Sequence, residues 1–303
     1  NEYGPTENSV CSTFYEITNK DTKILIVGLG LIGGSYAQVL TSNGFEVGAL
    51  DTNSDSIAYA TETHIISHGR CFPDADYVGQ FDIIVFSLYP HTFIEWIENN
   101  QHMIKSGALI TDVTGVKCGV VYKVQDILRR DLEFIGAHPM AGRELSGVRN
   151  ARKEIFEGAN YIVTPTDKNS SDAIDICKKL GELLGFKSIS VLSPEKHDEM
   201  IGFLSQLTHC IAISLMVCRD SESLALYTGD SFKDLTRIAK INDAMWSELF
   251  LLNKDELLSQ MDLFSEKFET LRKTIENDDI DTMREIMRLS TSRREYFDNI
   301  KKD

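Results

Sequence analysis

The sequence is poor in features that mark several protein classes. Its six cysteines, at positions 11, 71, 118, 177, 210 and 218, form neither a CxxC pair nor a regular framework. Basic residues are in deficit, with 31 Lys and Arg against 46 Asp and Glu, a formal net charge of −15. Scattered thiols favour a reducing compartment, the cytoplasm. The negative charge argues against nucleic acid or an anionic membrane as a partner.

Signals for export and for several common active sites are also missing. Residues 1–21 have no basic flank and no apolar core, so we expect an N-terminal extension rather than a secretion signal. The most apolar stretch, residues 201–218, is interrupted by polar residues between 205 and 209, which favours a helix buried in a bundle over a membrane span. No P-loop, nucleophile elbow or metal-ligand spacing occurs, so no metal site is expected.

The first half of the chain alternates apolar strand patterns with helical ones. Helical spacing follows the first strand and recurs near 91–101 and 117–130. Alternation of this length predicts an α/β, Rossmann-type domain with a doubly wound parallel sheet. The expected strands are residues 23–28, 45–51, 81–88, 107–113 and 132–137, with one more at 161–165 that precedes a helix ending near Gly185.

After about residue 192 the pattern is helical to the end. Ser193 and Pro194 are typical of an N-cap and a first helical residue. We therefore predict an N-terminal extension (1–21), a nucleotide-binding domain (22–190) and an all-α domain (191–303). An apolar stripe on its long helix fits packing within the subunit or a homodimer interface equally well; the stripe comprises Leu257, Met261, Phe264, Phe268, Leu271 and Ile275.

The sequence GLGLIG lies directly between the first strand and its helix. It places Gly28, Gly30 and Gly33 in the GxGxxG spacing, in which the glycines allow a tight turn, close approach to a pyrophosphate, and helix packing on the strand. The free N–H groups of the helix start, with Leu31 and Ile32, would face the phosphates. The motif therefore predicts a dinucleotide site.

The end of the second strand indicates which dinucleotide binds. Asp51 follows Gly33 by eighteen residues, where a carboxylate can accept hydrogen bonds from ribose hydroxyls. Thr52 and Asn53 offer no arginine for a 2′-phosphate, so NAD is favoured over NADP. A solvated strand-end or N-cap carboxylate is the alternative interpretation of Asp51.

Three segments in a fixed order resemble one family. The segments GAHPMAGRELSG (136–147), LSQLTHCIA (204–212) and FKDLTRIAKINDAMW (232–246) follow the dinucleotide motif. This set resembles the prephenate dehydrogenases, a group that includes the arogenate dehydrogenases. The resemblance implies a Rossmann domain, a helical dimerisation domain, and oxidative decarboxylation of prephenate to 4-hydroxyphenylpyruvate with reduction of NAD.

The resemblance assigns the catalytic role to His138, which we expect in a loop after a strand. As hydride leaves the carbinol carbon of prephenate, positive character develops there, and a neutral imidazole accepting from the hydroxyl stabilises it. The alternative is a histidine that only ties down its loop. The histidines at 64, 68, 91, 102 and 197 lack metal-ligand spacing, and no role is assigned to them.

The resemblance also implies a set of substrate contacts. Ser205 and His209 would share one helix face toward the substrate, although a hydrogen-bonded core histidine is an alternative. Arg237 would grip a carboxylate, unless it pairs with Asp234 instead. Glu144 matches an acidic residue at the cleft edge.

Two positions depart from the family pattern. Gly115 stands where many relatives have serine, and either Thr114, one residue earlier, or a water molecule is the candidate for the missing hydroxyl. Gln206 stands where some relatives carry a second histidine, and could influence the choice between a keto and an amino substrate. The sequence hardly separates prephenate from arogenate. A catalytically silent NAD-binding regulator is the alternative of another class.

Overall fold

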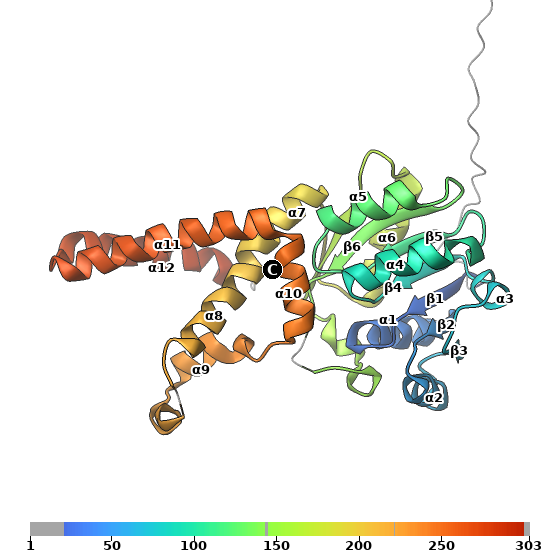
Figure 1. The fold of residues 1–303 in the computed structure, drawn as a ribbon, viewed down its shortest axis with the longest axis horizontal. Helices are drawn as coiled ribbons and strands as arrows, with labels where there is room; N and C mark the ends of the chain where they lie inside the picture. The colour runs from blue at the N-terminus through green and yellow to red at the C-terminus, as the bar shows by residue number, and fades with distance from the viewer. Residues whose placement is uncertain (1–20, 143–144, 221, 300–303) are drawn as a thin grey trace, which may run out of the picture. The chain divides into compact units, whose positions relative to one another are not determined.

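The computed structural model describes residues 21–142, 145–220 and 222–299 (Figure 1). The expected extension at 1–21 therefore lies almost wholly outside the described residues. The chain forms two compact units, one ending at Asn253 and the other beginning at Lys254. By this division, some of the helices that follow residue 191 fall in the same unit as the sheet and the others in the second unit.

An eight-stranded sheet forms the centre of the first unit, in the order β3-β2-β1-β4-β5-β6-β7-β8. The first six strands are parallel, as expected, but β7 runs antiparallel to β6. Sequence analysis missed the short strands β3 and β8. The strands are β1 (Lys23–Val27), β2 (Glu46–Leu50), β3 (His68–Arg70), β4 (Ile83–Phe86), β5 (Leu109–Asp112), β6 (Glu133–Pro139), β7 (Asn160–Thr164) and β8 (Ser188–Val191).

Helices cover both faces of this sheet, which confirms the Rossmann-type prediction. One apolar core lies under α1, α2 and α6, and a second lies under α3, α4 and α5. Gly185, in the left-handed conformation, ends α6 where the sequence predicts a stop. These helices are α1 (Leu31–Ser42), α2 (Ser54–Glu62), α3 (Ala75–Val78), α4 (Pro90–Asn100), α5 (Cys118–Ile127) and α6 (Ser171–Leu184).

The helical part of the first unit begins as predicted, with the Ser193 side chain accepting from the Lys196 N–H and Pro194 in the first turn. One continuous helical stretch comprises α7 (Pro194–Ile201), a π-helical segment η4 (Gly202–Leu207) and α8 (Thr208–Val217). By length and composition it could cross a membrane. Only 28% of its apolar 18-residue window is buried inside the single chain. The expectation of a buried helix was therefore wrong for the single chain.

Two helices complete the first unit, α9 (Asp230–Thr236) and α10 (Asp243–Leu252), and two more form the second, α11 (Lys254–Glu276) and α12 (Ile280–Asn299). On α11, Phe268 is 61% and Ile275 60% exposed. The predicted apolar stripe is therefore exposed over much of its length, although Leu257 at its start is buried. Short 3₁₀ turns η1 (Gln101–Met103), η2 (Val148–Asn150), η3 (Lys153–Ile155), η5 (Ser223–Tyr227) and η6 (Arg237–Ala239) connect the larger elements.

Candidate active site

The turn between β1 and α1 has the geometry that a dinucleotide loop requires. Gly28 has φ +97°, and a Cβ there would lie 2.4 Å from the Ser87 carbonyl oxygen. A Cβ at Gly33 would lie 2.0 Å from the Gly28 carbonyl oxygen, so this glycine lets α1 pack on the strand. At Gly30 a Cβ would meet nothing within 4 Å. The backbone at Gly30 is thus open to a ligand, as a pyrophosphate needs.

The Asp51 carboxylate braces this turn from the end of β2. Its Oδ2 accepts from the Leu29 N–H at 2.7 Å, and its Oδ1 accepts from the Asn53 N–H at 2.8 Å. Each carboxylate oxygen retains a lone pair, because an ionised carboxylate offers about four acceptor positions. Asp51 therefore orders the loop and can still accept from ribose hydroxyls.

A buried ion pair lies behind the carboxyl ends of β5 and β6. Lys117 Nζ lies 2.7 Å from Asp112 Oδ2, and both side chains are fully buried. Lys117 also donates to the Ala137 carbonyl oxygen at 2.6 Å, one residue before His138. Burial lowers the pKa of Lys117, and the neighbouring Asp112 carboxylate opposes that shift. The pair fixes the backbone that carries His138.

Thr114 belongs to this ion-pair network. Its hydroxyl contacts Asp112 Oδ2 and the Val116 carbonyl oxygen, and Lys117 Nζ lies 3.2 Å from it. Thr114 is buried, and the described contacts of its hydroxyl all lie within this network. That Thr114 supplies the hydroxyl of the family serine stays a prediction.

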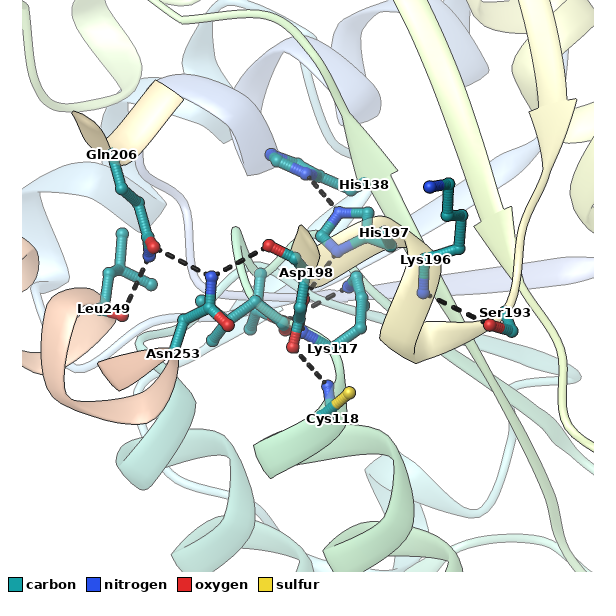
Figure 2. A network of polar contacts seen from close by, with 12 residues as sticks. Lys117, Cys118, His138, Ser193, Lys196, His197, Asp198, Gln206, Leu249 and Asn253 are labelled. Atoms are coloured by element: carbon teal, nitrogen blue, oxygen red, sulfur yellow. Dashed lines mark hydrogen bonds and ion pairs between the residues drawn. The ribbon is translucent and has the colours of Figure 1, made fainter. Parts of the chain in front are cut away.

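His138 lies within β6, one residue before its end, and not in the loop that sequence analysis expected. Its Nδ1 lies 2.8 Å from Nε2 of His197, which is buried at the start of α7. Nδ1 of His197 lies 2.7 Å from Asp198 Oδ1 (Figure 2). The imidazole of His138 is thus the end of a His–His–carboxylate chain, which sequence analysis missed because it assigned His197 no role.

Asp198 is the anchor of this chain. Its Oδ1 also accepts from the Lys117 N–H at 2.8 Å, and its Oδ2 accepts from the Cys118 N–H at 2.8 Å. Burial alone would raise the pKa of Asp198, but the hydrogen bonds from His197 and from these two backbone groups lower it. The carboxylate is therefore ionised at neutral pH.

His138 and His197 are both neutral at neutral pH. Burial lowers the pKa of His138 well below 6.5, and the neighbouring His197 and Lys117 lower it further. Burial also lowers the pKa of His197, although Asp198 opposes this shift. A neutral His138 can accept a hydrogen bond, as the sequence argument requires.

Gly115 borders the other nitrogen of His138. A Cβ at Gly115 would lie 3.9 Å from His138 Nε2 and 3.5 Å from a methyl group of Leu249, both ordinary contacts. Gly115 does not have a positive φ. The position would therefore accept a side chain, and in this protein it leaves space beside the imidazole nitrogen that faces away from His197.

His209 lies beside an aromatic ring near the start of α8. Its imidazole packs against the Trp246 ring of α10, with ring centroids 3.8 Å apart and the planes tilted by 31°. His209 Nδ1 lies 2.9 Å from the Ser205 carbonyl oxygen. Both Ser205 and His209 are half-buried, so the π-helical segment and α8 present them together without enclosing them.

Gln206 forms hydrogen bonds that link three segments of the helical part. It is buried, its Nε2 donates to the Leu249 carbonyl oxygen at 2.9 Å, and its Oε1 accepts from Asn253 Nδ2 at 2.8 Å. Asn253 also donates to the Asp198 carbonyl oxygen at 3.0 Å (Figure 2). Both ends of the Gln206 amide are engaged, so Gln206 connects α10 to the His–His–carboxylate chain.

The remaining expected residues are less closely defined. Arg237 begins the turn η6, which packs against α8, and its side chain is exposed. Glu144 and its neighbour Arg143 lie outside the described residues.

The fold and the site together define a class, that of two-part dehydrogenases with a Rossmann-type nucleotide domain. The family model "Prephenate dehydrogenase, nucleotide-binding domain" matches residues 36–190, and "Prephenate dehydrogenase, dimerization domain" matches residues 193–289. The chain therefore belongs to the prephenate dehydrogenase family.

Individual relatives agree with this assignment. The chain is 32% identical to the prephenate dehydrogenase of Bacillus subtilis, over 93% of this chain and 76% of that protein. It is 27% identical to the cyclohexadienyl dehydrogenase of Zymomonas mobilis, over 89% of this chain and 94% of that protein.

Among solved structures, the chain is similar to the prephenate dehydrogenase of Aquifex aeolicus in complex with hydroxyphenyl propionate and NAD⁺. That match has a TM-score of 0.83 and 31% identity, and it covers 91% of this chain and 98% of that one. The arogenate dehydrogenase of Synechocystis has the same fold, with a TM-score of 0.78 and 22% identity over 91% of this chain and 100% of that one.

Proposed function

We propose that this protein catalyses the NAD-dependent oxidative decarboxylation of prephenate to 4-hydroxyphenylpyruvate. The observation that carries the proposal is the neutral His138 at the carboxyl edge of the sheet that bears the dinucleotide loop. Ligands of open α/β sheets bind at that edge. His138 Nε2, beside Gly115, faces away from His197 and is the atom that meets the substrate hydroxyl.

The residues at the β1–α1 turn fit NAD. The open backbone at Gly30 receives the pyrophosphate, the N-terminus of α1 with Leu31 and Ile32 offers N–H groups, and Asp51 accepts from the ribose. When bound there, NAD supplies the acceptor for the hydride.

The protein's own contribution is made around the ring hydroxyl. His138 Nε2 accepts a hydrogen bond from that hydroxyl and stabilises the positive charge that develops as hydride leaves the carbinol carbon. The bond to the ring carboxylate then breaks, its electron pair enters the ring, and CO₂ leaves. The hydroxyl proton stays with the product phenol, so His138 ends the cycle neutral.

The substrate carboxylates need cationic or hydrogen-bonding partners in an acidic protein. We assign a carboxylate contact to Arg237, whose planar guanidinium suits it, and contacts with the side-chain end to Ser205 and His209. Glu144 is assigned to the edge of the cleft on the family pattern alone.

Initial rates of NADH formation with prephenate and with arogenate, measured in parallel at 340 nm, test this function. We expect turnover of prephenate with a larger kcat/KM than that of arogenate. A reversed preference would make the protein an arogenate dehydrogenase with the same mechanism. NAD binding without turnover of either compound would leave only a nucleotide-binding protein.

The substitution Gly30→Ala tests the cofactor site. We expect it to fold normally, because a Cβ at Gly30 meets nothing within 4 Å, but to weaken NAD binding by about tenfold or more, since the methyl group occupies the path of the pyrophosphate. Calorimetric titration with NAD measures the Kd. Gly229→Ala, at another open glycine, is the matched control. Equal Kd values for the two variants would place the pyrophosphate elsewhere.

Exposed apolar side chains on the C-terminal helices indicate how the protein assembles. We assign a homodimer formed through the C-terminal helices, since Phe268 and Ile275 on α11 and Phe203 near α8 are exposed in the single chain. The second copy, rather than a membrane, covers these side chains.

The thiols indicate the compartment. All the described cysteines are free, namely Cys71, Cys118, Cys177, Cys210 and Cys218, which favours the cytoplasm.

A further inference from the structure

The hydrogen bonds around His197 determine which nitrogen of each imidazole carries its proton. The ionised Asp198 only accepts, so the proton between it and His197 belongs to His197 Nδ1. A neutral His197 then has an unprotonated Nε2, which must accept from its neighbour. The proton of His138 is therefore on Nδ1, and its Nε2 has a free lone pair.

We propose that His197 and Asp198 are positioning residues that hold His138 in the one tautomer able to accept a hydrogen bond from the substrate hydroxyl. The proposal rests on the proposed function, because it concerns the same reaction. Neither residue touches the substrate; each acts through His138.

The backbone around Asp198 makes the opposite tautomer costly. In the opposite tautomer the Asp198 carboxylate would have to donate a proton to His197, although its two oxygens already accept from the N–H groups of Lys117 and Cys118. His197 and these two backbone groups are the three donors to the carboxylate. They lie at the starts of α5 and α7, so the packing of the two helices fixes the carboxylate. Asn253 holds the Asp198 carbonyl oxygen from the end of α10.

The same arrangement favours the transition state electrostatically. Positive charge shared with His138 develops in a buried site, where interactions between charges are stronger than in water. The Asp198 carboxylate lies one imidazole away and is not neutralised by a side-chain cation among the contacts the structure describes for it. Lys117 is paired instead with Asp112. His197 thus transmits a stabilising negative charge to His138 without being ionised itself.

Two substitutions of His197 separate positioning from packing. Asparagine places its amide near the position of imidazole Nδ1, so His197→Asn can still donate to Asp198 but leaves His138 without a partner. Glutamine is one carbon longer and places its amide near Nε2, so His197→Gln can accept from His138 Nδ1. A role in packing alone predicts no such difference between the two variants.

We expect His197→Asn to lower kcat on the order of 10²-fold, with a smaller change in the KM for prephenate, and His197→Gln to retain at least about tenfold more activity than His197→Asn. His68→Gln is the matched control, because His68 is hydrogen-bonded to Tyr77 and Glu46 and does not belong to the His–His–carboxylate chain. Its kcat should equal that of the wild type. Equal losses in the two His197 variants, or no loss in either, would overturn the proposal.

Nitrogen-15 NMR of the histidine-labelled wild type reports the tautomer directly and does not depend on turnover. We expect His138, assigned by comparison with His138→Asn, to be protonated on Nδ1 and unprotonated on Nε2 at neutral pH. A proton on Nε2, or on both nitrogens, would contradict the proposal. Absence of turnover with prephenate in the wild type would refute the proposed function, while the spectrum would still report the tautomer.

Discussion

The substitution His138→Asn is expected to lower kcat for prephenate by 10²- to 10⁴-fold, on the order of what general acid–base groups contribute. The asparagine amide lies near the position of imidazole Nδ1 and can still donate to His197 Nε2, so the neighbouring chain of hydrogen bonds is retained. What disappears is the acceptor at Nε2. Initial rates of NADH formation measure the effect, and calorimetric titration with NAD should give the wild-type Kd. A kcat within tenfold of the wild type would remove His138 from the mechanism.

The pH dependence of the wild type provides an independent check on the same residue. Only neutral His138 accepts from the hydroxyl, so activity is lost as pH falls through its pKa. Burial, with His197 and Lys117, lowers that pKa well below 6.5, so kcat/KM should persist below pH 6.5. The charged groups that face this region are Lys117, paired with Asp112, and Asp198 beyond His197. An acidic limb centred at or above pH 6.5 would contradict a neutral His138.

The parts of the fold that sequence predicted are those with local signals. The GxGxxG turn, the Gly185 stop of α6 and the Ser193–Pro194 start of α7 each depend on neighbouring residues only. The direction of β7 could not be predicted, because an apolar run specifies a strand but not which way it pairs. Its antiparallel pairing with β6 includes His138, opposite Ile162, and so determines how the imidazole is held.

The candidate site was predicted in part, for a similar reason. The resemblance of the segment GAHPMAGRELSG to a family motif marked His138. His197 carried no such signal, because it sits in a charged segment, PEKHDEM, that reads as a solvent-facing first turn. Its burial comes from packing against the loop before α5, 80 residues away in sequence, where Asp198 accepts from the Cys118 N–H. A long-range contact of this kind leaves no periodic pattern in the chain.

Two positions that depart from the family pattern have hydrogen-bond partners that become visible only in the fold. Thr114 has the hydroxyl that Gly115 lacks, but the buried Asp112 and Lys117 engage it. Gln206 replaces a histidine in some relatives, but α10 engages both ends of its amide. In each case the described hydrogen bonds are to other groups of the protein, which the residue type alone does not predict.

The substitution Lys117→Met is expected to lower the free energy of unfolding by about 3–5 kcal/mol, because it leaves the Asp112 carboxylate buried without its cation. Urea unfolding followed by circular dichroism measures the change. Lys178→Met is the matched control: its partner Asp175 is on the surface of α6, and exposed pairs contribute about 0–1 kcal/mol. Lys117→Met combined with Asp112→Asn should recover part of the loss, since the unpaired charge is gone.

A loss for Lys117→Met no larger than that for Lys178→Met would mean that the buried pair does not stabilise the fold. The variant also has a catalytic consequence with a definite sign. Lys117 lowers the pKa of His138, so removing its positive charge favours the imidazolium and should move the acidic limb of kcat/KM to higher pH. The same lysine thus connects the two properties, because it holds the backbone at Ala137 and keeps the adjacent imidazole neutral.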